Sequence, residues 1–490
     1  MIPRWADLRS NATLPLAAGR ATAFAASFCI PAVLARTFPP AVFGTYKQIF
    51  LLQATLFGIA QIGMAESLFY FVPADSRRSG RFVANAIVAL AISGLVTAAA
   101  LTLAAPAIAV WFDNPSLAHY LPLLALSVWL VLVAAPLEIV LTARHRYIGA
   151  AFTYAASDAV KAVLLLVPAV VTRDLTWLMA GAVMFGALRV GGLLTIARRE
   201  FGGSLRPAAA LASEQAAYVV PFAAYVCVEV VQMSVHQFAV SAWTDPATFA
   251  IYAVGCLNVP VTELIAGPAC NVMMVGLRGE TSAADGGLRL WRETTARIAL
   301  IVAPIVALLF VLSREIITLL FTDTYAASVH VFRVFLLVPL FAILQTDGVL
   351  RSRAETRFLL VLSVVKLGVV LVSVGPLLRY LGLPGAALSA VLALASAKLG
   401  ALIRMRRVFG WRARRLLPWR ELSETFAAAT AAGVLAFLVK SAVRARLDAH
   451  AHPLEATIPA VATFALVYGA FLGLVRLTRR DASCAASPAS

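Results

Sequence analysis

Charged residues are scarce in this 490-residue chain, and acidic residues are the scarcer kind. Asp, Glu, Lys and Arg together make up 13% of the sequence, and 24 acidic residues stand against 41 basic ones. Apolar and aromatic residues make up 61%. Because soluble domains typically carry about 25% charged residues, this composition excludes an ordinary water-soluble globular protein.

Sequence motifs of soluble catalysis are also missing. The chain has no G-x-x-x-x-G-K-[ST] phosphate loop, which excludes ATP hydrolysis by that route. Its 5 cysteines lack metal or redox spacing, so we expect small apolar core residues and no metal site. The connections between apolar stretches leave no room for a soluble catalytic domain. We therefore expect no catalytic residues, no cofactor and no enzyme activity.

Long apolar stretches take the place of those features. A helix needs about 20 apolar residues to cross the hydrocarbon core of a bilayer. The sequence predicts an all-α polytopic membrane protein with 14 transmembrane helices. The predicted spans are residues 13–34, 42–62, 83–105, 120–141, 150–171, 175–196, 217–240, 250–275, 298–320, 329–350, 358–378, 385–403, 422–439 and 458–475.

The arginines concentrate in every second gap between the spans. By the positive-inside rule, this places both termini in the cytoplasm. The first span is too long for a signal peptide, contains Arg20 and leads straight into another span, so we expect no cleavage. The formal charge of +17 suits anionic lipid headgroups and does not indicate nucleic-acid binding.

A weak internal repeat divides the chain. Pro40-Ala41-Val42-Phe43-Gly44-Thr45-Tyr46 returns as Pro246-Ala247-Thr248-Phe249-Ala250-Ile251-Tyr252, and Val160-Lys161 returns as Val365-Lys366. Six spans in each unit make a parallel repeat, because an even number inserts both units the same way round. We expect an N-lobe at 1–206, a C-lobe at 207–410, two appended spans within 411–480 and a disordered cytoplasmic tail at 481–490.

The loop after the first span carries a resemblance to a known family. Leu34-Ala35-Arg36-Thr37-Phe38-Pro39-Pro40-Ala41-Val42-Phe43-Gly44-Thr45-Tyr46 resembles the "LAR-hydrophobic-P-x-x-[FY]-G-x-Y" loop of bacterial polysaccharide-biosynthesis flippases. These are the O-antigen-type members of the multidrug/oligosaccharidyl-lipid/polysaccharide exporter superfamily. Phe321-Thr322-Asp323-Thr324-Tyr325-Ala326-Ala327-Ser328 is similar to the family's stretch after span 9, but has Thr322-Asp323 where Gly is common.

Cations inside the predicted spans are candidates for a substrate site. Arg20, Lys161 and Lys366 lie within spans, where an isolated charge costs about 2.5–3.5 kcal/mol. We predict that they line a cationic cleft that binds a diphosphate. Two alternatives stay open: Arg20 snorkels to the headgroups, and Asp158 neutralises Lys161 three residues away.

Uncharged polar and acidic residues mark the same predicted cleft, which the resemblance places along spans 1, 2, 7 and 8. The predicted polar lining consists of Gln53, Gln61, Gln232, His236 and Asn258, and the predicted ion-coupling groups are Asp158, Glu229 and Glu263. The coupling ion would be H⁺ or Na⁺. Alternatively, these residues form interhelical hydrogen bonds, and His236 has a structural role.

Other charges lie closer to the predicted membrane surfaces. We expect most of Arg189, Arg297, Arg333 and Lys398 to snorkel to the interface, and Arg314 to pair with Glu315 there.

The resemblance implies a flippase that moves a polyprenyl-diphosphate-linked oligosaccharide to the outer leaflet by alternating access. It also implies a location in the bacterial inner membrane, contacts with membrane lipids, and a polysaccharide polymerase complex as a candidate partner. A drug/cation antiporter and a lipid II flippase are alternatives within the superfamily. A membrane-embedded polymerase or glycosyltransferase, or a scaffold of an export complex, would be a different class of protein.

Overall fold

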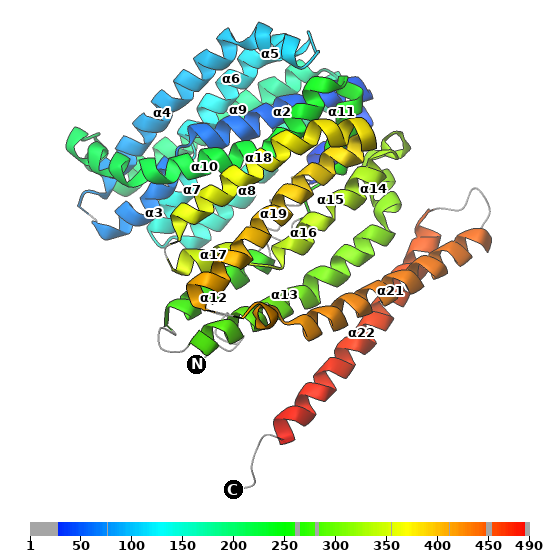
Figure 1. The fold of residues 1–490 in the computed structure, drawn as a ribbon. Coiled ribbons are helices and arrows are strands. Elements are labelled where there is room, and N and C mark those ends of the chain that lie inside the picture. Colours follow the sequence, from blue (N-terminus) through cyan, green and yellow to red (C-terminus); the bar gives the residue numbers. More distant parts are fainter. Residues whose placement is uncertain are drawn as a thin grey trace. The chain divides into compact units, whose positions relative to one another are not determined.

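The computed structural model describes residues 28–75, 77–259, 265–279, 284–353, 355–410, 412–446 and 453–485. Helices and short turns account for this part of the chain, and it contains no strand, which confirms the all-α prediction (Figure 1). The chain divides into two compact units, Met1–Ala253 and Val254–Ser490.

The first unit begins, in its described part, with the helix Phe28–Thr37. Nine further α-helices follow, and the unit ends within a tenth, α11. They are α2 (Pro40–Ala60), α3 (Met64–Ala74), α4 (Ser79–Leu103), α5 (Ala105–Trp111), α6 (Leu117–Val133), α7 (Leu137–Ala143), α8 (Tyr147–Thr172), α9 (Leu175–Phe201), α10 (Ala209–Trp243) and α11 (Pro246–Gly255).

The described part of the second unit also consists of helices and short turns. Its helices are α12 (Gly267–Gly279), α13 (Ala284–Val311), α14 (Ser313–Phe321), α15 (Ser328–Phe335), α16 (Leu337–Ala342), α17 (Thr346–Ser352), α18 (Thr356–Leu381), α19 (Leu383–Phe409), α20 (Ala413–Leu416), α21 (Trp419–Arg446) and α22 (Pro453–Ala485). Helices α18 and α19 pack side by side, as do α21 and α22 (Figure 1).

The described residues contain 11 helices long and apolar enough to cross a membrane, or 12 if the bent pair α2–α3 is one span. The prediction of 14 is therefore not confirmed. Most of predicted span 1 lies outside the described residues. Predicted span 8, residues 250–275, is wrong as a continuous helix, because α11 ends at Gly255 and residues 257–259 are not helical.

The second half repeats elements of the first at an offset of 209 residues. Helix α8 starts at Tyr147 and α18 at Thr356, and the positive-φ turns at Asp113 and Arg173 return at Thr322 and Gly382. The expected lobe boundary at residue 206 stays a prediction. Helix α10, which we assigned to the C-lobe, packs against α2, α3 and α4 within the first unit.

The repeated Pro-Ala-x-Phe-x-x-Tyr motif starts α2 and α11 and anchors both helices. Phe43 and Phe249 are fully buried, and Tyr46 and Tyr252 are 5% and 0% exposed. Gly44 is needed for a close approach of the two motifs, because a Cβ there would lie 1.8 Å from the carbonyl oxygen of Pro246. The glycine of the motif is therefore a packing requirement.

Asp245 caps the second copy of the motif. Its carboxylate accepts hydrogen bonds from the backbone of Ala247 and Thr248 and from the Thr248 hydroxyl, at 2.6–3.0 Å. The bonds from Thr248, side chain first, hold the pKa of Asp245 below its ordinary value. The cap is therefore ionised at neutral pH, as the positive end of a helix dipole favours.

Thr322 explains why glycine is common at this point in the resembled family. It ends α14 with φ 77° and ψ 167°. This region of backbone space is essentially restricted to glycine, and a β-branched residue is strained there by about 1–3 kcal/mol.

We expect Gly44→Ala to lower the free energy of unfolding by about 1–3 kcal/mol, because the backbone of α11 must shift. Gly191→Ala in α9 is the matched control, because a Cβ at Gly191 meets nothing within 4 Å. Thermal unfolding in detergent checks this. Equal unfolding temperatures for the two variants would contradict the packing role of Gly44.

We expect Thr322→Gly to raise the free energy of unfolding by about 1 kcal/mol through relief of backbone strain. The same unfolding measurement serves here, with Thr318→Gly inside α14 as the control. The control should destabilise by about 1 kcal/mol, because glycine is unfavourable within a helix. A loss of stability in Thr322→Gly would rule out the strain.

Candidate functional site

A buried hydrogen-bond network joins α2, α10 and the turn after α5. Asn114 donates to Thr45 Oγ1 at 2.9 Å and to Gln48 Oε1 at 2.6 Å. Gln48 in turn donates to Ser241 Oγ at 3.0 Å. All four residues are at most 5% exposed. A satisfied buried network of this kind fixes helices against one another and leaves little capacity for a ligand.

A bidentate ion pair lies among α7, α8 and α9. Both terminal nitrogens of Arg189 contact the Glu138 carboxylate at 2.7 Å, and one also donates to Ser157 Oγ at 3.1 Å. The Arg189 and Glu138 side chains are 15% and 5% exposed. Arg189 therefore does not snorkel to the membrane surface, and our expectation for this residue was wrong.

Asp158 and Lys161 of α8 belong to the same charged cluster. Both side chains are half-buried. Asp158 interacts electrostatically with Lys161, Arg189 and Glu138, in that order of weight. Two cations and two acids thus meet between three apolar helices, where each charge is stabilised by the others.

The second unit contains a related cluster. Lys398 of α19 lies 3.3 Å from Asp347 Oδ1 and 3.3 Å from Thr346 Oγ1, both of α17. Lys366 of α18 interacts electrostatically with Asp347. Lys398 is 11% exposed and Asp347 is 53% exposed, so this pair is the more accessible of the two. The expected snorkelling of Lys398 was also wrong.

These two ion pairs occupy equivalent positions of the repeat. Asp347 and Lys398 each follow their counterparts, Glu138 and Arg189, by 209 residues. Our reading of the sequence missed them because it judged each charge by its depth in the membrane. The sequence does contain a signal for these pairs, because an acid and a base recur 209 residues later. The same offset relates Arg144 to Arg353.

Four predicted cleft residues lie on α2, in the turn that follows it and on α10. Gln53 is half-buried, and its buried Oε1 has no hydrogen-bond partner among the described residues. Gln61 donates to the Glu66 carboxylate, and Gln232 is 6% exposed. His236 is 3% exposed and shares a 2.6 Å hydrogen bond with the Tyr252 hydroxyl, so it has the partner that a structural role requires.

Two more of the residues predicted along spans 7 and 8 are described. Glu229 is half-buried on α10, and Asn258 is exposed in the non-helical segment after α11. Arg20 and Glu263 lie outside the described residues. The assignment of substrate and ion contacts to all these residues stays a prediction.

Glu315 corrects the pairing that we expected with Arg314. It bonds Lys440 at 3.0 Å and lies 3.6 Å from Arg444, both on α21. Lys440 also donates to the carbonyl oxygen of Val311 at 2.6 Å. The first turn of α14 is thereby fixed to α21.

Arg333 of α15 lies at the edge of an apolar groove. It donates to Ser313 Oγ at 2.8 Å and stacks over the Phe310 ring at 5.2 Å. The groove has a volume of about 550 Å³, and apart from Arg333 its lining consists mostly of apolar residues of α13, α16 and α21. Among the described residues no group of three or more His, Cys, Asp or Glu side chains is placed to hold a metal.

Solved structures with this fold define the class. A lipid II flippase MurJ in an inward closed conformation is 11% identical, with a TM-score of 0.72 over 92% of this chain and 98% of that one. An inward-facing multidrug resistance MATE family transporter of the MOP superfamily is 13% identical, with a TM-score of 0.56 over 79% and 94%. A MOP superfamily transporter from Pyrococcus furiosus is 15% identical, with a TM-score of 0.55 over 82% and 96%. The fold is thus the MurJ/MATE-like fold of a multi-pass membrane protein.

The family follows from the sequence. The family model described as "Polysaccharide biosynthesis protein" matches residues 33–330, which is more than half of the chain. The chain belongs to this polysaccharide biosynthesis protein family. No curated relative matches the sequence at a significant level.

We expect Glu138→Gln to lower the free energy of unfolding by about 3–5 kcal/mol, because it leaves Arg189 buried without its counter-charge. The double variant Glu138→Gln/Arg189→Met should recover most of that loss. Asp347→Asn should cost about 1 kcal/mol or less, because its carboxylate is half exposed. Chemical unfolding in detergent measures all three, and a single variant no less stable than the double one would contradict the pairing.

Proposed function

We propose that the protein is a flippase that carries a polyprenyl-diphosphate-linked oligosaccharide from the inner to the outer leaflet of a bacterial inner membrane. The observation that carries the proposal is a charged cluster inside the membrane helices of each half, in a chain of the polysaccharide biosynthesis family. We further propose an orientation with both termini in the cytoplasm and alternating access as the mechanism.

The physical argument concerns the headgroup. Each sugar hydroxyl left without a partner in hydrocarbon costs a few kcal/mol, and an unpaired diphosphate costs far more. Lys161 and Lys366 belong to clusters whose acids already hold them within the helices. A diphosphate would exchange with these acids as the counter-ion, so the cations do not have to become unpaired at any stage. Arg20 is the third proposed contact.

The apolar groove beside Arg333 suits the other end of such a substrate. Its lining includes Phe310, Leu340, Phe426 and Phe437. A prenyl chain in this groove would stay in an apolar environment while the headgroup crosses. The appended helix α21 supplies one side of the groove, which gives this helix a role in the proposal.

Ion coupling is part of the proposal. Asp158, Glu229 and Glu263 are the proposed ion-sensitive groups, with H⁺ or Na⁺ as the ion. Moving one charge across about 100 mV supplies about 2.3 kcal/mol, so one or two ions are enough to bias the cycle. A polysaccharide polymerase complex is the proposed partner downstream of the flippase.

A lipid II flippase is the second candidate, favoured by the fold similarity over nearly the full length of MurJ. The two candidates differ in cargo and are separated by offering both lipids to the purified protein. A drug/cation antiporter is less well supported, since α21 and α22 follow the repeated part of the chain. A membrane-embedded glycosyltransferase is less well supported, since the connections between the apolar stretches leave no room for a soluble catalytic domain.

Deletion of the protein followed by leaflet-resolved analysis of lipid-linked glycans tests the function. We expect glycans to accumulate in the inner leaflet. A normal distribution between leaflets with loss of the polymer would instead indicate a polymerase or a scaffold.

We expect Lys366→Met to slow flipping by about tenfold or more, because a charge-assisted contact to the diphosphate is lost. Arg379→Gln, at the exposed far end of the same helix, is the matched control and should flip normally. The measurement is the inner-leaflet glycan pool in cells with equal membrane levels of each variant. Wild-type flipping by Lys366→Met would remove this residue from the site.

A further inference from the structure

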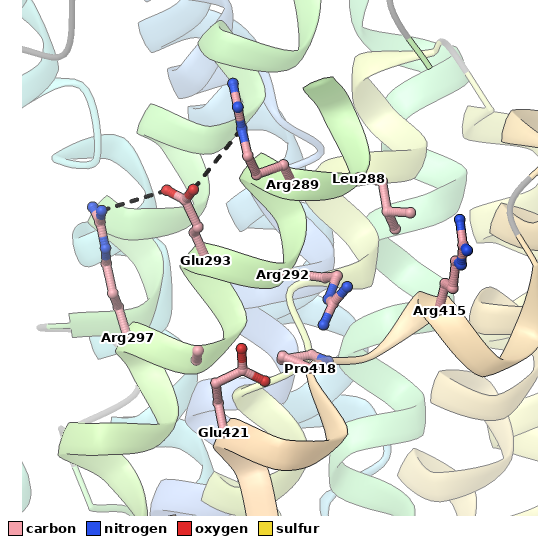
Figure 2. Close-up of a pocket in the computed structure, with 9 residues that line it drawn as sticks. Leu288, Arg289, Arg292, Glu293, Arg297, Arg415, Pro418 and Glu421 are labelled. Carbon is pink, nitrogen blue, oxygen red and sulfur yellow. Dashed lines mark hydrogen bonds and ion pairs between the residues drawn. The ribbon is translucent and has the colours of Figure 1, made fainter. Parts of the chain in front are cut away.

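The first turns of α13 and the segment from α20 into α21 enclose a basic pocket within the second unit. The pocket has a volume of about 750 Å³. Four arginines and two glutamates line it, together with three uncharged residues (Figure 2). The charged lining consists of Arg289, Arg292, Glu293, Arg297, Arg415 and Glu421.

The pocket is held in shape by a buried indole. Trp291 is fully buried, and its Nε1 donates to the carbonyl oxygen of Leu416 at 2.9 Å. This bond fixes α13 against α20. Arg292 directly follows Trp291 in the sequence, and Arg415 directly precedes Leu416. The backbone positions from which the two arginines extend are therefore held close together, which reduces the ordering needed when a ligand binds.

The arginines of the pocket differ in their partners. Arg289 and Arg297 share Glu293, at 4.0 Å and 3.5 Å (Figure 2). Arg292 reaches toward the segment between α20 and α21, and neither it nor Arg415 has an ion-pair partner among the described residues (Figure 2). Two guanidinium groups are thus available for an anionic ligand.

The balance of charge indicates the chemistry of that ligand. Four arginines and two glutamates leave an excess of two positive charges. A headgroup with two phosphate groups would neutralise this excess, and guanidinium groups bind phosphate oxygens in a bidentate fashion. Our orientation places this end of α13 at the cytoplasmic surface, where basic pockets between membrane helices take anionic headgroups.

We propose that this pocket is a binding site for the headgroup of a membrane lipid that carries two phosphates. Arg292 and Arg415 make the phosphate contacts, and Glu293 keeps Arg289 and Arg297 aligned along the rim. The same chemistry occurs in a bilayer lipid of the cardiolipin type and in a polyprenyl diphosphate. Binding at this pocket does not require translocation, so a binding measurement tests this site independently of the proposed flippase activity.

Native mass spectrometry of the purified full-length protein tests the site, with cardiolipin, polyprenyl diphosphate, phosphatidylglycerol and phosphatidylcholine as probes. We expect Arg292→Gln/Arg415→Gln to bind the two-phosphate lipids about 10- to 30-fold more weakly than wild type. Arg406→Gln/Arg414→Gln is the matched control, because it removes the same charge from exposed positions outside the pocket. The control should bind like wild type.

The source of the headgroup follows from which probe loses affinity. A loss for cardiolipin alone identifies a bilayer lipid, a loss for polyprenyl diphosphate alone identifies a substrate-like lipid, and a loss for both identifies the shared group. The proposal is overturned if the two double variants bind the two-phosphate lipids equally well. It is also overturned if wild type binds phosphatidylcholine as tightly as it binds the two-phosphate lipids. If the first double variant does not fold, Arg415→Gln against Arg414→Gln gives the same comparison on adjacent, exposed residues.

Discussion

The cost of an unpaired charge in hydrocarbon is the constraint on which this structure depends. The protein meets it with ion pairs between helices: Glu138 with Arg189 in one half and Asp347 with Lys398 in the other. Because each pair joins helices that are distant in sequence, it fixes their register and depth. The same charges place polar groups among the apolar helices of each half, where the proposed hydrophilic cargo would need them.

The repeat explains why these features come in pairs. One offset of 209 residues relates the ion pairs, the positive-φ turns at Asp113 and Thr322, and the starts of α8 and α18. The two halves have nevertheless diverged. The pair in the first half is bidentate and enclosed, whereas Asp347 is half exposed. We interpret the first as the more structural cluster and the second as the more accessible one.

Composition and periodicity were enough to predict an all-α membrane fold, and the motif around Gly44 was enough to predict the family. The break in predicted span 8 was missed because the prediction used hydropathy alone, whereas Gly255 and Pro260 are residues that interrupt helices. Partners of buried charges were also missed. Hydropathy reports the depth of Arg189 or Glu315 but not which helix lies opposite, and that information comes only from packing.

The account is tested most directly by reconstitution. The purified protein in liposomes that contain a polyprenyl-diphosphate-linked oligosaccharide should move the glycan between leaflets, as measured by its accessibility to a membrane-impermeant lectin. We predict movement by the wild-type protein that is faster than in protein-free liposomes and depends on Lys366. Glycan that stays in its starting leaflet, with folded protein present under an imposed ion gradient of either H⁺ or Na⁺, would contradict the central claim.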